Sequence, residues 1–175
     1  MESFRIDGAS DRDYTIRVDE ALDVTPELVR TLIEIDLQTF AESTYSPYTA
    51  AAFLKSGRVY LLCADDLTIG TCVCMRAWDR AREAMILSMG IRPGWRGRGL
   101  GQVFVTGVLD KLRARGLRSC VLLVGEDNRR AVKVYEDVGF QVVEQREVDA
   151  EHNEVLLLMR IQLRPDDAEV IELKA

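Results

Sequence analysis

The sequence is poor in the residues that most often build metal centres and disulfide frameworks. It has a single histidine, His152, and four cysteines, none of which lies in a Cys-x-x-Cys pair. Structural zinc is usually held by closely spaced cysteines and histidines, so no metal site is expected. The cysteines, at positions 63, 72, 74 and 120, lie among apolar or β-branched neighbours. Buried, reduced thiols are their expected state.

Long apolar runs and an excess of positive charge are also missing. No segment approaches membrane-spanning length and no signal peptide opens the sequence, so we expect a cytoplasmic protein without a membrane partner. Lys and Arg number 23 against 29 Asp and Glu, a formal net charge of −6. Nucleic-acid binding needs a basic surface, so no nucleic-acid partner is expected. The acidic balance mildly favours a cationic substrate, although it also serves solubility alone.

What the sequence does contain suits one globular domain. Its 175 residues are 47% hydrophobic, enough to bury a core. We expect a flexible, polar N-terminus over residues 1–12, a domain over 13–164, and an acidic C-terminal tail over 165–175. No internal repeat or low-complexity linker divides the chain.

Hydrophobic periodicity and punctuating residues predict the elements of this domain. The predicted order is a strand (14–21), a helix with Thr25 as N-cap, a short helix (49–57), a meander of three strands (58–65, 67–78, 81–91), a helix ending at Gly116, a strand (118–125), a helix ending at Gly139, and two last strands (140–148, 154–163). The crossover from strand 81–91 through a helix to strand 118–125 requires a parallel pair. The expected fold is therefore α+β, with a mixed, mostly antiparallel sheet of six to seven strands and about four helices.

A glycine cluster stands between a predicted strand and a predicted helix. Over residues 96–101, Arg-Gly-Arg-Gly-Leu-Gly, three glycines occupy alternate positions beside two arginines. Free backbone N–H groups and the positive end of the helix dipole meet at such a junction, which favours a phosphate or pyrophosphate. The alternative is a tight turn with solvated arginines. The dinucleotide pattern fails because Gln102 stands where the third glycine is needed, and no P-loop Gly-Lys-Ser/Thr is present.

Two motifs together resemble the GNAT superfamily of N-acetyltransferases. The run Arg96-Gly97-Arg98-Gly99-Leu100-Gly101, preceded by Ile-Arg-Pro, resembles its acyl-CoA pyrophosphate loop. The run Asn128-Arg-Arg-Ala131-x-x-x-Tyr135-Glu136-x-x-Gly139-Phe140 is similar to its other signature. They cover roughly residues 83 to 140, in the order and at the separation usual in the family. In motif, the chain is nearest to the ribosomal-protein N-terminal acetyltransferase branch.

The resemblance implies acetyl-CoA as the acyl-donor cosubstrate and assigns residues to it. The backbone amides of residues 96–101 would hold the pyrophosphate, and the main chain of Met89 and Ile91 would pair with the pantetheine arm. This requires strand 81–91 to splay from strand 118–125, as in the family fold. Asn128 would bond the pantetheine or the backbone near it; as the alternative, or in addition, it caps the following helix. Members of the family are often homodimers.

Acetylation of an amine needs a base for the amine and an acid for the departing thiolate. In the resemblance Tyr135 is the acid, because a phenol stays protonated at neutral pH; plain packing is the alternative. The resemblance to strands of the ribosomal-protein branch, which carry a glutamate at the same distance before the glycine loop, makes Glu83 the expected base; the alternative is a solvated strand-end carboxylate beside Arg80 and Arg82. Ser88, Glu42 and Tyr45 are reserve candidates for the base. The backbone of residues 89–91 would supply the oxyanion donor.

The sequence therefore predicts an acetyl-CoA-dependent N-acetyltransferase that acts by direct attack of a primary amine in a ternary complex. The amine would be a peptide N-terminus, a lysine or a small amine, because residues 14–80 match no branch closely enough to name it. Asp36, Phe40, Glu42 and Tyr45 stand where a cationic amine could sit, or equally form helix surface and core. The alternative is a catalytically silent acyl-CoA-binding module. An unrelated nucleotide-phosphate binder would leave the motif from Asn128 to Phe140 unexplained.

Overall fold

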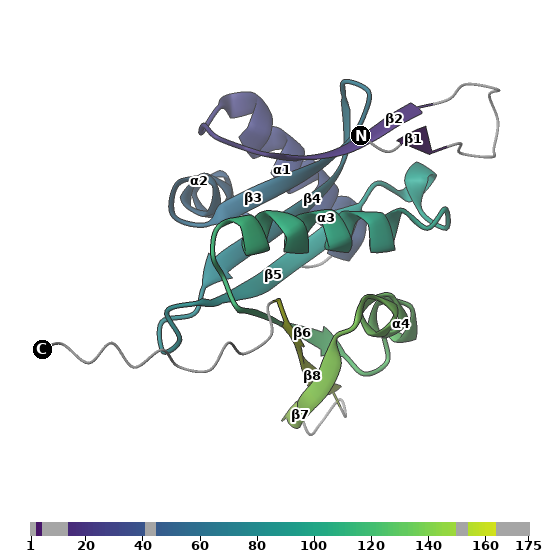
Figure 1. Cartoon of the computed structure of the whole chain (residues 1–175). Helices are drawn as coiled ribbons and strands as arrows, with labels where there is room; N and C mark the ends of the chain where they lie inside the picture. The colour runs from purple at the N-terminus through teal and green to yellow at the C-terminus, as the bar shows by residue number, and fades with distance from the viewer. Residues whose placement is uncertain (1–2, 5–13, 41–44, 150–153, 164–175) are drawn as a thin grey trace, which may run out of the picture.

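The computed structural model describes residues 3–4, 14–40, 45–149 and 154–163. Figure 1 shows one mixed sheet with helices on its faces. The elements are β1 (Ser3–Phe4), β2 (Tyr14–Glu20), α1 (Pro26–Phe40), α2 (Pro47–Ser56), β3 (Arg58–Ala64), β4 (Leu67–Arg76), β5 (Glu83–Ile91), the 3-10 turn η1 (Pro93–Trp95), α3 (Leu100–Ala114), β6 (Ser119–Gly125), α4 (Arg129–Val138), β7 (Gln141–Asp149) and β8 (Glu154–Gln162). The expected single-domain fold is confirmed.

Strand order in the sheet is β1-β2-β3-β4-β5-β6-β8-β7, and every pairing is antiparallel except that of β5 with β6. The predicted strands correspond to β2–β8. The two-residue β1 adds an eighth strand at one edge, where it pairs with β2. Apart from Ser3–Phe4, the expected flexible N-terminus lies outside the described residues, and so does the expected acidic tail over 165–175.

Side-chain caps explain where the helices begin. The hydroxyl of Thr25 accepts a hydrogen bond from the N–H of Leu28 (3.2 Å), as its predicted N-cap role requires. Helix α2 begins two residues before its predicted start, because Ser46 caps it through the N–H of Thr49 (3.1 Å) and Pro47 occupies the first helical position. These two caps fix the first residues of α1 and α2.

The core lies on both faces of the sheet. On one face, α1 and α2 pack over Val59 and Val73 of the meander. On the other, α3 buries Phe104, Val108 and other apolar side chains against the alternate residues of the same strands. All four cysteines are buried and free, as expected. Among the described residues, no helix is long and apolar enough to cross a membrane.

Gly90 brings α1 unusually close to β5. A Cβ at this position would lie 2.4 Å from Oγ1 of Thr39 and 3.2 Å from Cγ2 of Ile35, so only glycine fits beneath the last turns of the helix. The C-terminal end of α1 is therefore held over the end of β5. This contact positions one wall of the site described below.

The parallel strands β5 and β6 pair over only four residues and then diverge. Register pairs run from Glu83 with Ser119 to Ile86 with Leu122. At the next residue, Leu87, the register between β4 and β5 shifts by a bulge. Beyond this point β5 follows β4 while β6 stays with β8, and Figure 1 shows the β6–β8–β7 half turning away from β5. The expected splay is confirmed.

Candidate active site

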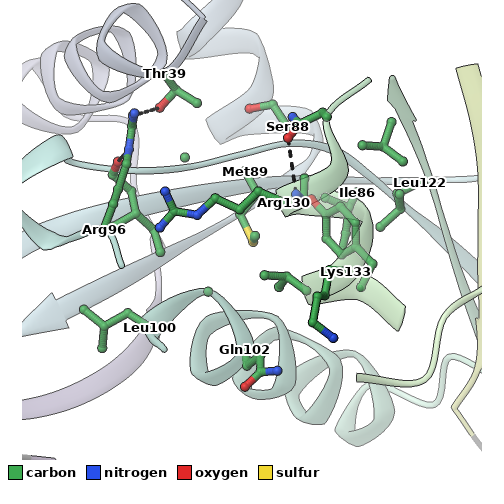
Figure 2. A pocket seen from close by; sticks show the side chains of 18 of the residues that line it. Thr39, Ile86, Ser88, Met89, Arg96, Leu100, Gln102, Leu122, Arg130 and Lys133 are labelled. Carbon is green, nitrogen blue, oxygen red and sulfur yellow. Dashed lines mark hydrogen bonds between the residues drawn. The ribbon is translucent and has the colours of Figure 1, made fainter. Parts of the chain in front are cut away.

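The divergence of β5 from β6 opens a cleft of about 1010 Å³. Its walls come from the second half of β5, the glycine cluster, the start of α3, the end of β6 and the first turns of α4. Figure 2 shows side chains from these elements directed into it, with Thr39 of α1 at one rim. The predicted site residues on its lining are Met89, Ile91, Arg96, Gly97, Gly99, Leu100, Gly101, Asn128 and Tyr135.

The glycine cluster forms one end of this cleft. Gly97 and Gly99 take left-handed φ angles of 81° and 74°, which favour glycine. Helix α3 begins directly afterwards, and no side chain caps it. Among the described residues, no acceptor bonds the N–H groups of residues 97–101. Unpaired amides at a helix N-terminus fit a phosphate or pyrophosphate group.

Cationic side chains of α4 face this loop, and the sequence analysis missed them. A Cβ on Gly97 would lie 3.7 Å from Nη2 of Arg130, so this guanidinium reaches the loop across the cleft. Arg129 and Lys133 also line the cleft. Two arginines in the first turn of a helix oppose its dipole, which is unfavourable unless an anion binds there. The two arginines at the start of this helix are therefore the feature of the sequence that could have indicated an anion near α4.

The two arginines of the loop, Arg96 and Arg98, make different contacts. Arg96 donates from Nε to the carbonyl of Ile91 (2.6 Å) and from Nη2 to the carbonyl of Gln38 (2.9 Å) and the hydroxyl of Thr39 (3.3 Å). It therefore fastens the loop to β5 and α1. The guanidinium of Arg98 lies over the ring of Trp95, 5.6 Å from its centroid, and is not part of the cleft lining. The predicted cofactor-binding role of the Arg98 side chain is therefore not supported by its position.

The open edge of β5 presents main-chain groups to the cleft. The N–H of Arg92 donates to the carbonyl of Ile69 in β4 (2.8 Å). Because alternate residues of a strand point their amide groups to opposite edges, Ile91 and Met89 direct theirs away from β4. The bond from Arg96 to the carbonyl of Ile91 agrees with this direction. An extended ligand could pair with this edge.

Tyr135 forms the wall opposite β5. It is 8% exposed, its ring lies 5.7 Å from that of Phe140, and it lines the cleft. Burial raises the pKa of its phenol well above the ordinary value, so the hydroxyl is protonated at neutral pH. Asn128 caps the same helix by accepting from the N–H of Ala131 (3.2 Å) while also lining the cleft.

Glu83 is not brought into the cleft. It lies at the paired end of β5, 5% exposed, where its Oε2 accepts hydrogen bonds from Ser119 (2.8 Å) and from Nε of Arg160 (3.1 Å). It lies beside Arg80, as the alternative expected, with Nη1 of Arg80 3.8 Å from its Oε2, but it is buried and does not line the cleft with Tyr135. The resemblance to similar strands, from which its role as base was expected, does not show which partners a side chain meets across the sheet.

A second polar group lies on the α1 side of β5. Ser88 lines the cleft, and its side chain interacts with the hydroxyl of Tyr45. Tyr45 also contacts Asp36, a buried residue of α1. Burial raises the pKa of Tyr45 to about 12 and that of Asp36 above its ordinary value. Glu42, the other candidate base, lies outside the described residues.

The rim of the cleft near this polar group is apolar. Phe40, Leu87 and Leu123 all line the cleft and are 43%, 42% and 47% exposed, respectively. They come from α1, the bulge of β5 and the end of β6. Exposed apolar side chains gathered at a cleft favour a partly apolar ligand there.

Comparison with known proteins gives a consistent result. The model of the acetyltransferase (GNAT) family matches residues 25–140. A mycothiol acetyltransferase of Streptomyces scabiei is 42% identical over 71 residues, which are 38% of this chain and 23% of that protein. The chain thus spans less than a quarter of that relative. The [ribosomal protein bS18]-alanine N-acetyltransferase of Haemophilus ducreyi is 25% identical over 124 residues, 66% of this chain and 83% of the relative.

Solved structures share the fold. The ribosomal-protein-S18-alanine N-acetyltransferase of Escherichia coli superposes with a TM-score of 0.73 at 17% identity, covering 88% of this chain and 99% of that one. A Salmonella typhimurium protein solved with its cofactor acetyl-CoA superposes with a TM-score of 0.71 at 20% identity, covering 89% of this chain and 96% of that one.

Proposed function

The chain belongs to the GNAT family of acetyltransferases, and from this we propose that it transfers an acetyl group from acetyl-CoA to a primary amine within a ternary complex. The observation that carries the proposal is the cleft between β5 and β6. Unpaired amides and cations stand at one end of it, an open strand edge runs along it, and a protonated phenol lies in its wall.

The described residues fit acetyl-CoA as the donor. The N–H groups of residues 97–101 would hold the pyrophosphate, with Arg130 and Lys133 supplying charge opposite the loop. The main chain of Met89 and Ile91 would pair with the pantetheine arm, and Asn128 would contribute its side-chain amide. When bound, acetyl-CoA supplies the activated thioester.

Tyr135 would protonate the departing thiolate, since its phenol carries a proton at neutral pH and lies on the cleft wall. The amine would lose its proton on the opposite side of the cleft, where Ser88 lines it and interacts with Tyr45. Because the carboxylate of Glu83 is already bonded away from the cleft, we assign it a structural role instead.

The apolar rim favours an acceptor whose amine is attached to an apolar group. Phe40, Leu87 and Leu123 would contact that group. An N-terminal amine beside a small apolar side chain has this character, and the relative from Haemophilus ducreyi acts, by its name, on an alanine of bS18. Peptide N-termini therefore come first among the acceptors to test, followed by lysine peptides and small amines.

The test combines a thermal-shift titration with acetyl-CoA and release of free CoA thiol over these amines. A ligand that binds only the native state at 100 times its Kd adds about 2.7 kcal/mol to the unfolding free energy. Stabilisation with amine-dependent thiol release would support the proposal. Stabilisation without release by any amine would favour a silent acyl-CoA-binding module, and no stabilisation would overturn both.

A matched pair of glycine variants tests the phosphate end of the cleft. Gly99 and Gly116 have φ angles of 74° and 79°, and a Cβ on either would meet no atom within 4 Å. Gly99→Ala and Gly116→Ala should therefore lower the melting temperature similarly. Only Gly99→Ala should weaken acetyl-CoA binding, by roughly tenfold or more, because its methyl group would crowd the charge-assisted hydrogen bonds between the loop and the pyrophosphate. Equal affinities in the two variants would contradict the assignment.

A further inference from the structure

Asp36 is a buried carboxylate with an unused oxygen. The residue is 3% exposed, and among the described residues its Oδ2 finds no hydrogen-bond partner. Burying an ionised carboxylate whose hydrogen bonds are not all satisfied lowers the stability of the folded protein. A group that lowers stability in this way is often kept for function.

Its position connects it to the cleft. Asp36 precedes Thr39 and Phe40 by three and four residues on α1, so the three share one helix face, and the latter two line the cleft. The hydroxyl of Tyr45 interacts with Asp36 on one side and with Ser88 on the other. Ser88 itself lines the cleft next to the bulge at Leu87. Figure 2 shows Ser88 above Met89, on the side of the cleft nearer Thr39.

We infer that Asp36 is the terminal acceptor of a proton relay that leaves the cleft through the hydroxyls of Ser88 and Tyr45. This rests on the proposed acetyl transfer. The ammonium of the acceptor gives a proton to Ser88, the Ser88 proton passes to Tyr45, and the Tyr45 proton passes to Asp36. Both hydroxyls end neutral, so only Asp36 changes charge.

The step balances over the whole reaction. The neutral nitrogen uses its lone pair to form the N–C bond, and the electrons of the broken C–S bond leave with sulfur. Tyr135 protonates that sulfur and is reprotonated by the second proton that the nitrogen loses. The first proton returns from Asp36 through the same relay to water after the product leaves, giving one amide, one thiol and one released proton.

The charges around Asp36 suit a transient proton store. Desolvation raises its pKa, and interactions with the backbone and hydroxyl of Tyr45 partly offset this. Tyr45 is the titratable group in contact with it, and Ser88 of β5 interacts with Tyr45. Cys72 of β4 belongs to the core on the other face of the sheet and acts on Tyr45 only through its charge. Among the described residues, no lysine, arginine or charged group of α2 interacts with the carboxylate. It therefore has no fixed partner that would lock it in the ionised state.

The stability of the free protein gives a test independent of turnover. Because the folded-state pKa of Asp36 lies above its unfolded value, its contribution is greatest below about pH 4 and is lost as pH rises through the folded pKa. The Asp36→Asn variant has no ionisable group at this position, so its stability does not fall as pH rises through this pKa. The variant should match the wild type at pH 3 and melt at a higher temperature than the wild type at pH 7. A melting temperature below that of the wild type at pH 7 would mean that the carboxylate is a structural anchor and would overturn the inference.

Kinetics give the second readout. With a good amine, Asp36→Asn should lose about 100-fold in kcat/KM at pH 7 with an unchanged Kd for acetyl-CoA, as when a general base is removed. Its log kcat/KM should rise by one per pH unit up to the pKa of the amine, because only free amine then reacts, while the wild-type profile is flat from pH 7 to 9. Asp110→Asn, the same change on the exposed face of α3, should resemble the wild type.

The relay also predicts non-additive losses. Tyr45→Phe and Ser88→Ala interrupt the same path, so either combined with Asp36→Asn should be no slower than Asp36→Asn alone. If the rate losses of the single variants multiply in the double variants, the relay alone is overturned. An Asp36→Asn variant with the rate and pH profile of the wild type would also overturn it. A wild type that releases no thiol with any amine would overturn the transfer and the relay together.

Discussion

Tyr135 is the residue whose chemistry and packing can be separated most cleanly. Its ring packs against Phe140, and phenylalanine preserves that contact. Tyr135→Phe should therefore leave the melting temperature and the Kd for acetyl-CoA nearly unchanged while kcat falls by about 100-fold, as expected when a general acid is removed. Single-turnover thiol release and calorimetric titration would measure the two quantities. Tyr48→Phe, on the exposed start of α2, is the control.

Weaker acetyl-CoA binding by Tyr135→Phe with unchanged kcat would leave Tyr135 a packing residue only. The raised pKa adds a pH expectation: Tyr135 should stay protonated throughout the range in which the protein is folded. The activity of the wild type should accordingly show no loss between pH 8 and 10 that the Phe variant lacks.

At the same scale, sequence reasoning identified the residues whose backbone matters better than those whose side chains meet across the fold. The glycines of the loop and Asn128 were found because positive φ angles and helix caps demand particular residue types. Arg130 was missed and Glu83 was placed in the cleft, because both depend on contacts between segments far apart in the chain.

Among the elements, the parallel pair β5–β6 depends on a short locked region. Glu83 accepts hydrogen bonds from Ser119 of β6 and Arg160 of β8, so one carboxylate joins three strands just where the pair begins. Glu83→Gln leaves Arg160 without its counter-charge and should lower the unfolding free energy by about 1–3 kcal/mol. Urea unfolding would measure this, with Glu136→Gln on the exposed face of α4 as control.

Turnover at saturating substrates should survive Glu83→Gln at a temperature where the variant is folded. Full stability combined with a lost rate and an altered pH profile would instead restore Glu83 as the base. The two outcomes are distinct because Glu83 does not line the cleft.

Periodicity predicted the elements themselves because burial alternates every two residues in strands and every three to four in helices. The parallel pair followed from the handedness of crossovers. The bulge at Leu87 could not be predicted in this way, since an extra residue in one strand leaves the apolar pattern nearly intact. Strand β1 was not predicted because a two-residue strand shows no hydrophobic period.

At the scale of the whole molecule, a net negative charge coexists with a local cluster of positive side chains. The chain carries a formal charge of −6, yet Arg96, Arg129, Arg130 and Lys133 all line the cleft. Composition argued against a nucleic-acid partner but could not show this local concentration, which arises only when α4 folds back opposite the loop. The fold class was predictable from the order of elements; the width of the cleft was not, because it depends on where β5 and β6 stop pairing.

The hydrogen bonds of Arg96 have a consequence for the order in which substrates bind. One guanidinium joins the glycine loop over residues 96–101, where we propose that the pyrophosphate binds, to the last turn of α1, which carries Thr39 and Phe40 of the cleft rim. Filling the loop should steady that turn before the amine arrives, so we expect compulsory-order kinetics with the nucleotide first on and last off. Free CoA should then inhibit competitively against acetyl-CoA and noncompetitively against the amine. Arg96→Lys, which lacks the planar fork of donors, should shift the pattern toward random order.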